Sequence, residues 1–228
     1  MNKHLLILLA ALLPLVASAQ TKVEIDGIWY NLTSETKQAE VTYGDTKYSG
    51  DITIPATVTY NGAAYSVTSI GECAFEDCSS LTAITIPEGV TSIENEAFRG
   101  CSSLTAITLP EGVTSIGEWA FSGCSGLTAI TLPEGVTSIR YDAFSSCSSL
   151  TTIVLPKSVE YISSGAFADC SELTDVYCYA ETVPGTEADA FDGSYIEYAT
   201  LHVPASAMNS YKTTAPWSGF GTLKTIEM

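Results

Sequence analysis

Seven cysteines give this chain its most obvious chemical potential, and five of them recur at a constant interval along the sequence. The five are Cys78, Cys101, Cys124, Cys147 and Cys170. Regularly spaced cysteines can form disulfides or bind a metal ion. Equivalent residues on stacked repeats, however, lie about 4.8 Å apart with parallel side chains, which suits disulfide geometry poorly. We therefore expect a buried column of free thiols that pack as small apolar side chains.

Two cysteines require separate treatment. The repeat equivalents of Cys73 are Glu96, Trp119, Asp142 and Gly165, so Cys73 is expected at an exposed position, either as a free thiol or paired with Cys78. Cys178 and His202 would suit a nucleophile and its base. Strand alternation places Cys178 inward and His202 outward, so we expect no dyad.

Other catalytic signals are absent from the sequence. Glu88, Glu111 and Glu134 recur at the repeat interval and could coordinate Ca²⁺, but a solvated ridge is the favoured interpretation because Lys157 occupies the next equivalent position. The chain has no Cys-x-x-Cys motif, phosphate-binding glycine loop or nucleophile elbow. We expect a protein that is not an enzyme and has no catalytic residues, cofactor or metal.

The whole 23-residue unit repeats, and this repetition predicts the elements that carry these residues. In one unit, Leu81 to Ile86 ends in apolar–polar alternation, which is typical of a short strand. Pro87 ends that strand, and Pro-Glu-Gly predicts a turn with proline at its second position and glycine at its fourth. One unit is too short to bury its own apolar face, so the units must stack. The predicted fold is a solenoid, with 23-residue coils and stacked, parallel, short strands.

The period breaks down at both ends, which predicts caps. Ile28, Tyr30 and Leu32 alternate opposite Ala39, Val41 and Tyr43, as expected for a β-hairpin. Asn61-Gly62 predicts a second hairpin that projects from the first coil. At the other end, a helical turn and a strand are expected after the last degenerate repeat. The predicted organisation is a signal peptide at 1–19, an N-terminal cap at 20–51, a solenoid at 52–193 with an insertion near 56–66, and a degenerate repeat with a C-terminal cap at 194–228.

The N-terminal segment, 1–19, predicts export. Lys3 precedes an unbroken apolar run from Leu5 to Val16, and Ala17-Ser18-Ala19 fits a cleavage site, so the mature chain should begin at Gln20. The formal net charge of −17 disfavours nucleic acids and anionic membranes as partners. We expect a bacterial protein that is secreted, held at the cell surface or periplasmic, with no membrane insertion of the mature chain.

The pattern Leu-x-x-Ile-x-(Ile/Leu)-Pro…Val-x-x-Ile-x-x-x-Ala-Phe-x-x-Cys resembles the BspA-like surface-antigen family of leucine-rich repeats. Ala97-Phe98, Ala120-Phe121, Ala143-Phe144 and Ala166-Phe167 each lie shortly before a cysteine. The resemblance implies a leucine-rich-repeat solenoid that binds host matrix proteins or other cell-surface proteins, without catalytic residues. The alternative is a structural or scaffold protein of the cell envelope that has no specific ligand.

Candidate partner-binding residues are those that escape the repeat or form its outward face. Outward positions of the predicted strands carry a row of threonines that continues into Tyr177 and His202, but threonine also suits strands for its β-propensity. Trp119, Arg140 and Tyr141 share one edge and have the composition of an interaction hot spot, although the Trp119 ring could equally pack on its own solenoid. The full set of candidates is Trp119, Arg140, Tyr141, Tyr177, His202, Thr85, Thr108 and Thr131. The sequence makes no prediction of the oligomeric state.

Overall fold

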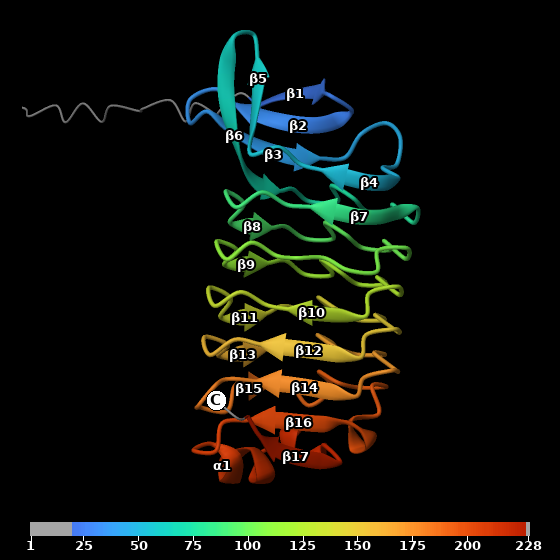
Figure 1. Ribbon diagram of the computed structural model, residues 1–228, viewed down its shortest axis with the longest axis vertical. Coiled ribbons are helices and arrows are strands. Elements are labelled where there is room, and N and C mark those ends of the chain that lie inside the picture. Colours follow the sequence, from blue (N-terminus) through green and yellow to red (C-terminus); the bar gives the residue numbers. More distant parts are fainter. Residues whose placement is uncertain (1–19, 227–228) are drawn as a thin grey trace, which may run out of the picture.

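The computed structural model describes residues 20–226 as a stack of coils with a cap at each end (Figure 1). The predicted signal peptide, 1–19, lies outside the described residues. Most coils carry a first strand, which in the regular units follows the cysteine, and a shorter second strand. The first strands are β4 (Gly50–Thr53), β7 (Leu81–Thr85), β10 (Ala129–Thr131), β12 (Thr152–Leu155), β14 (Asp175–Cys178), β16 (Thr200–Val203) and β17 (Thr222–Thr225). The second strands are β6 (Ala63–Ile70), β8 (Ser92–Ile93), β9 (Ser115–Ile116), β11 (Ser138–Ile139), β13 (Tyr161–Ile162) and β15 (Gly185–Thr186).

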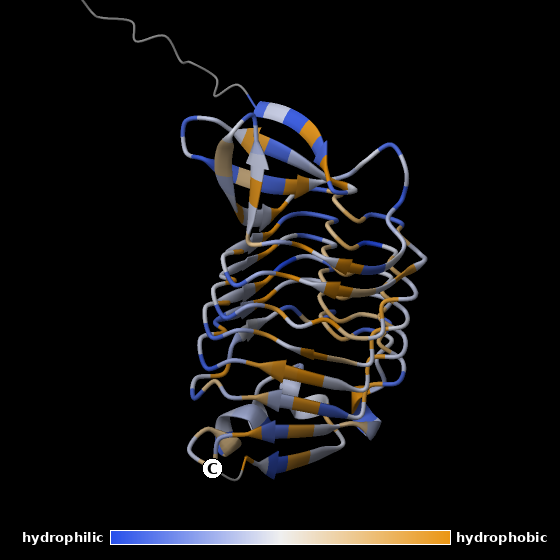
Figure 2. Ribbon diagram, turned by 45° about the horizontal axis from the view of Figure 1, so that its top comes forward, coloured by the Kyte–Doolittle hydropathy of each residue, from blue (hydrophilic) through white to orange (hydrophobic). Residues whose placement is uncertain are grey.

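Strand pairing confirms the predicted solenoid. Ile130 pairs with Ile153 and Ile153 pairs with Val176, in both cases in parallel and exactly one repeat further along the chain. Second strands pair in the same way, as Ile70 does with Ile93 and Ile93 with Ile116. Apolar residues recur at matching places on the stacked strands (Figure 2). Because neighbouring coils share one register, equivalent residues form straight columns along the molecule.

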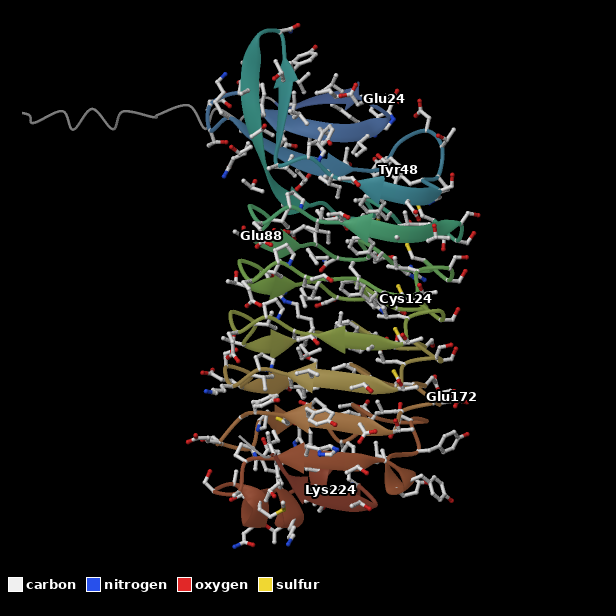
Figure 3. All side chains as sticks on the ribbon, in the orientation of Figure 1. Glu24, Tyr48, Glu88, Cys124, Glu172 and Lys224 are labelled. Atoms are coloured by element: carbon white, nitrogen blue, oxygen red, sulfur yellow. The ribbon has the colours of Figure 1, made fainter. Side chains whose placement is uncertain are left out.

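The core is a set of such columns. Six phenylalanines stack with ring centroids 5.1–5.5 Å apart. Tyr48 lies against the first ring of this column, at 4.8 Å from Phe75, and Trp217 lies edge-on to the last, at 5.6 Å from Phe191. Figure 3 shows sulfur atoms aligned down the interior near Cys124. The stacked rings are Phe75, Phe98, Phe121, Phe144, Phe167 and Phe191.

The thiols of the cysteine column also form hydrogen bonds with backbone carbonyl groups. The Cys101 thiol donates to the carbonyl oxygen of Phe75 at 3.1 Å, and Cys124, Cys147 and Cys170 repeat this contact one coil further along each time. Where the next cysteine would fall, Ser194 is fully buried and donates to the Phe167 carbonyl at 2.6 Å. A hydroxyl therefore replaces a thiol in the same role, which explains why this column prefers a small hydrogen-bond donor.

The N-terminal cap is a hairpin extended by a third strand. β2 (Ile28–Thr33) pairs antiparallel with β1 (Gln20–Ile25) and with β3 (Gln38–Thr42), and β3 then pairs in parallel with β6. The sequence did not predict β1. Tyr43, expected to face inward, is 54% exposed, because β3 ends at Thr42 and Thr42 takes the buried place. The cap thus continues the sheet of second strands.

The Asn61-Gly62 hairpin is present and projects above the first coils (Figure 1). Its strands are β5 (Thr57–Tyr60) and β6, and the turn residues have φ of 49° and 76°. Positive φ at both central residues defines a type I′ turn, which matches the twist of the flanking strands. Asparagine and glycine are the residues that adopt this conformation most readily.

The C-terminal cap combines short helices with a final strand. It contains the 3₁₀ helix η1 (Ile196–Tyr198), the helix α1 (Met208–Thr213), the 3₁₀ helix η2 (Trp217–Gly219) and β17. Trp217, Tyr211 and Phe220 from this cap are buried against the end of the stack. They seal the last apolar layer, as terminal units of a solenoid must.

Two local expectations were wrong. The turn hydrogen bond runs from Val90 N–H to the Pro87 carbonyl, so proline occupies the first turn position and Gly89 the third. Residues 104–109 form no regular strand, although they differ from 81–86 only at the last position, and Ile107 there is half-buried. The sequence offers no reason for this interruption.

Candidate functional site

The edge that carries Trp119 has an unusual backbone. Cys73, Glu96, Trp119, Asp142 and Gly165 form one column, and all have left-handed φ between 50° and 64°. This conformation costs a non-glycine residue roughly 1–2 kcal/mol, and a bulky aromatic residue is rare there. All five residues share this conformation, so the stacked backbone fixes the corner while the side chain at each position varies.

Contacts with the next coil fix the orientation of the Trp119 ring. Its Nε1–H donates to Asp142 Oδ2 at 3.2 Å, and the ring meets Tyr141 edge-on with centroids 5.2 Å apart. Trp119 is half-buried and Tyr141 is 42% exposed. Arg140 is exposed and, within residues 20–226, forms no ion pair. We call Trp119, Arg140, Tyr141 and Asp142 the corner site.

Gly165 makes room for this arrangement. A Cβ at position 165 would overlap the Asp142 carboxylate, and the φ of 64° at Gly165 is itself one that glycine adopts most easily. Glycine at 165 thus leaves the Asp142 side chain free to reach back to Trp119. The corner site is preorganised over three consecutive coils.

A second group lies at one end of the first-strand face. The rings of Tyr177 on β14 and His202 on β16 stack with centroids 4.1 Å apart and planes 11° from parallel. His202 Nε2 lies 2.8 Å from Asp175 Oδ1, which orients the imidazole. His202 also pairs with Lys224 on β17. Tyr177 and His202 are brought together as the strand pattern predicts, and we call them the aromatic end of the face.

The threonines of this face divide into two rows with different roles. In the row that contains Thr128, Thr151 and Thr174, each hydroxyl donates to a threonine carbonyl of the preceding coil, at 3.0–3.4 Å. The candidate threonines form the other row: Thr85, Thr108 and Thr131. They are exposed, and within residues 20–226 their hydroxyls have no hydrogen-bond partner. The hydroxyls of this second row are therefore available to a ligand.

The candidate residues therefore form two groups rather than one. Trp119 follows β9, in the sheet of second strands, whereas Tyr177 and His202 lie on β14 and β16, in a sheet of first strands. Thr131 pairs with Val154 and Val154 with Tyr177, so Thr131 is continuous with the aromatic end. Thr108 lies in the interrupted segment, beside a groove of about 330 Å³ that Thr131 also lines.

The cysteines show no arrangement for catalysis. All seven are free thiols. Burial raises the pKa of Cys124 and Cys170 to about 12, so these thiols stay protonated at neutral pH. Cys178 is fully buried against the Tyr211 hydroxyl at 3.1 Å, and burial raises its pKa. His202 faces outward and binds Asp175, so the expected absence of a Cys178–His202 dyad agrees with this geometry.

Among the described residues, the best candidates for metal ligation are Cys73, Glu76 and Glu96, whose ligand atoms lie within 4.8 Å of one another. Arg99 Nη1 already contacts both carboxylates, at 2.5 Å from Glu96 and 3.6 Å from Glu76. Burial and the neighbouring carboxylates raise the pKa of Cys73 to about 11, which leaves it a neutral thiol and a poor ligand. The Arg99 guanidinium thus supplies the positive charge that a metal ion would otherwise bring to these carboxylates, and we infer no metal centre. Glu88, Glu111 and Glu134 form no such group within residues 20–226.

Thiol labelling tests this description of the cysteines. The denatured, unreduced chain should expose seven thiols, while the folded protein should react at Cys73, which is only half-buried. Because its pKa is about 11, the labelling rate of Cys73 by iodoacetamide should keep rising roughly tenfold per pH unit above pH 9, where an ordinary cysteine levels off. Two or fewer thiols in the denatured chain would refute the column of free thiols.

Two exposed tyrosines were missed by sequence reasoning. Tyr195 is 56% exposed and Tyr198 is 85% exposed, both in the degenerate last repeat. The available signal was the spacing, because Val176 pairs with Leu201, which lies two positions further along the chain than the repeat predicts. One additional position lies before Gly185, which pairs with Tyr161, and the other lies between Phe191 and Thr200, in the stretch that holds these tyrosines.

The fold and its repeated pattern define a leucine-rich-repeat protein. A family model described as BspA type leucine rich repeat region matches six copies, over residues 51–174 and 91–211. The chain belongs to this family, as the sequence pattern predicted. Leucine-rich repeats typically bind proteins. No functionally curated protein matches the sequence.

Solved structures of bacterial leucine-rich-repeat proteins share the fold. The T. pallidum protein TpLRR is 35% identical with a TM-score of 0.61, over 69% of this chain and 71% of that one. A leucine-rich-repeat protein from Eubacterium ventriosum is 26% identical with a TM-score of 0.59, over 75% of this chain and 49% of that one. The pneumococcal vaccine antigen PcpA, at 23% identity and a TM-score of 0.62, shares the fold over 82% of this chain and 51% of its own. Within residues 20–226, no helix is long and apolar enough to cross a membrane.

Proposed function

We propose that the protein is an exported bacterial binding module without enzymatic activity, which recognises proteins at the cell surface or in the extracellular space. One observation carries this proposal: Trp119 occupies a strained left-handed corner and is held there by Asp142 and Tyr141. Tryptophan, tyrosine and arginine are the residues most enriched at binding hot spots. The corner site presents all three without using Arg140 in an internal ion pair.

The family assignment supports the same proposal, because leucine-rich repeats typically bind proteins and the PcpA structure is described as a vaccine antigen. The residues with catalytic potential support it as well. Cys178 is sealed in the core, and His202 is bound to Asp175 and stacked on Tyr177. The aromatic end of the threonine face offers a second contact surface for the same or another partner.

Binding to a panel of immobilised, purified host matrix proteins tests this function. The parent protein should bind at least one of them, and Trp119→Ala should weaken that binding about tenfold or more, since removing a hot-spot residue costs about 2 kcal/mol or more. Tyr177→Ala should weaken binding if the partner reaches the first-strand face.

Tyr161→Ala is the matched control, because Tyr161 is 41% exposed but lies outside both groups. It should bind as the parent does. If the parent binds nothing above background, or if Trp119→Ala and Tyr161→Ala are indistinguishable from it, the binding function fails and a scaffold without a ligand becomes the better description.

A further inference from the structure

The last coil departs from the regular repeat just before its first strand. The pairing of β16 with β14 begins at Asp175 and Thr200, and the 3₁₀ helix η1 precedes it. Ile196 packs against the core and Ala199 is 1% exposed, so these two residues face inward. Tyr198, which lies between them in the sequence, is 85% exposed. This irregular coil thus presents a tyrosine almost wholly to solvent.

Tyr195 reinforces this departure. It is 56% exposed and has a φ of 48°, in the left-handed region that disfavours aromatic residues. Burial of the side chain therefore does not account for the position of either tyrosine. Together they border a shallow hollow of about 360 Å³, which is completed by Ser171, Glu172, Leu173 and Thr174.

Acidic residues predominate in the part of the chain that forms this hollow. Between Lys157 and Lys212 the chain has nine Asp and Glu residues and neither lysine nor arginine. Glu172 lines the hollow and Glu197 lies between the two tyrosines, and both are exposed. Asp169 is also close by, since it contacts Gly193, two residues before Tyr195. Glu172 lies at the edge of the molecule opposite to Glu88, away from the Pro-Glu-Gly turns (Figure 3).

We propose that Tyr195, Tyr198 and Glu172 bind an arginine or lysine side chain on an extended segment of a partner protein. Exposed tyrosine rings attract cations through their π faces, and a carboxylate beside them adds a charge-assisted hydrogen bond. A basic partner is the one whose charge complements this surface, because none of the residues that line the hollow is a cation. This surface is separate from the corner site and does not depend on it.

Fluorescence anisotropy with a defined probe tests the proposal. The probe is a fluorescein-labelled dodecapeptide of alternating arginine and glycine, titrated with the full mature chain in 150 mM NaCl. The parent should bind it, and Tyr198→Ala, Tyr195→Ala and Glu172→Gln should each raise Kd about threefold to tenfold. The same peptide with glutamine in place of arginine should not bind.

The net charge of −17 attracts any polybasic peptide, so controls must separate the site from the general field. Tyr161→Ala changes an exposed tyrosine outside all of these sites, and Glu88→Gln removes one carboxylate at the opposite edge. Both should retain the parent Kd. If Tyr198→Ala binds the peptide as tightly as the parent, or if Glu88→Gln weakens binding as much as Glu172→Gln, the proposed site is wrong. Because Tyr198 and Glu172 are exposed, each variant should keep the parent melting temperature, and failure at this site leaves the corner site untouched.

Discussion

Phe121→Ala should lower the free energy of unfolding by about 3–5 kcal/mol, the usual range for removing a buried phenylalanine. Phe121 is fully buried at the middle of the aromatic column, with ring centroids 5.2 Å from Phe98 and 5.1 Å from Phe144. The cavity would lie between two coils whose backbones are held in register by hydrogen bonds, so they cannot close over it. Urea denaturation followed by circular dichroism measures the loss.

The phenylalanine column leads to a second expectation, which is specific to a stacked repeat. Each coil contacts mainly its neighbours, so a central cavity weakens the coupling between the two halves of the stack. The Phe121→Ala transition should therefore broaden as well as shift, with a lower apparent m-value. Thr108→Ala, on the exposed face, should stay within about 0.5 kcal/mol of the parent. A loss below about 1 kcal/mol for Phe121→Ala would contradict a core built on this column.

The repeat made the scaffold predictable from sequence because each position of the 23-residue unit reports its own environment several times. Phe121 and Cys124 could be placed in the core because an apolar residue of the same type returns at these positions in successive units. The same argument correctly placed Tyr177 and His202 side by side on successive strands. Where packing requires one type of residue at a position, its recurrence in successive units gives the information that an alignment of homologues would give.

Positions that occur only once were not predictable in the same way. Trp119 could be recognised as an exception, but its left-handed backbone and its bond to Asp142 depend on the corner geometry, which the pattern does not encode. Tyr198 was missed because an additional position interrupts the period in the last coil, and only the structure shows that its side chain is 85% exposed. Ser194 was not singled out by the sequence pattern, although it continues the hydrogen bond of the cysteine column. Function is therefore best sought at residues whose environment is set by tertiary contacts.

Trp217→Ala should be the most damaging change in the C-terminal cap, at about 3–5 kcal/mol. Trp217 is fully buried, and its Nε1–H donates to Thr186 Oγ1 at 3.0 Å. Its ring lies edge-on to Phe191, the last ring of the column, and to Tyr211. Removal would open the end of the apolar stack to water, so the variant should also self-associate. Urea denaturation and light scattering after size-exclusion chromatography measure the two effects.

Trp119→Ala is the matched control, and it should weaken partner binding while changing stability only a little. Its half-buried ring has one hydrogen bond and one edge contact, so its loss should cost only about 1 kcal/mol of stability. It should weaken partner binding, whereas Trp217→Ala below its unfolding transition should leave the corner site intact. Equal destabilisation by the two variants would mean that Trp119 is held for packing. In that case the strained corner would lose its significance as a binding site, and the face with Thr131, Tyr177 and His202 would become the surface to test.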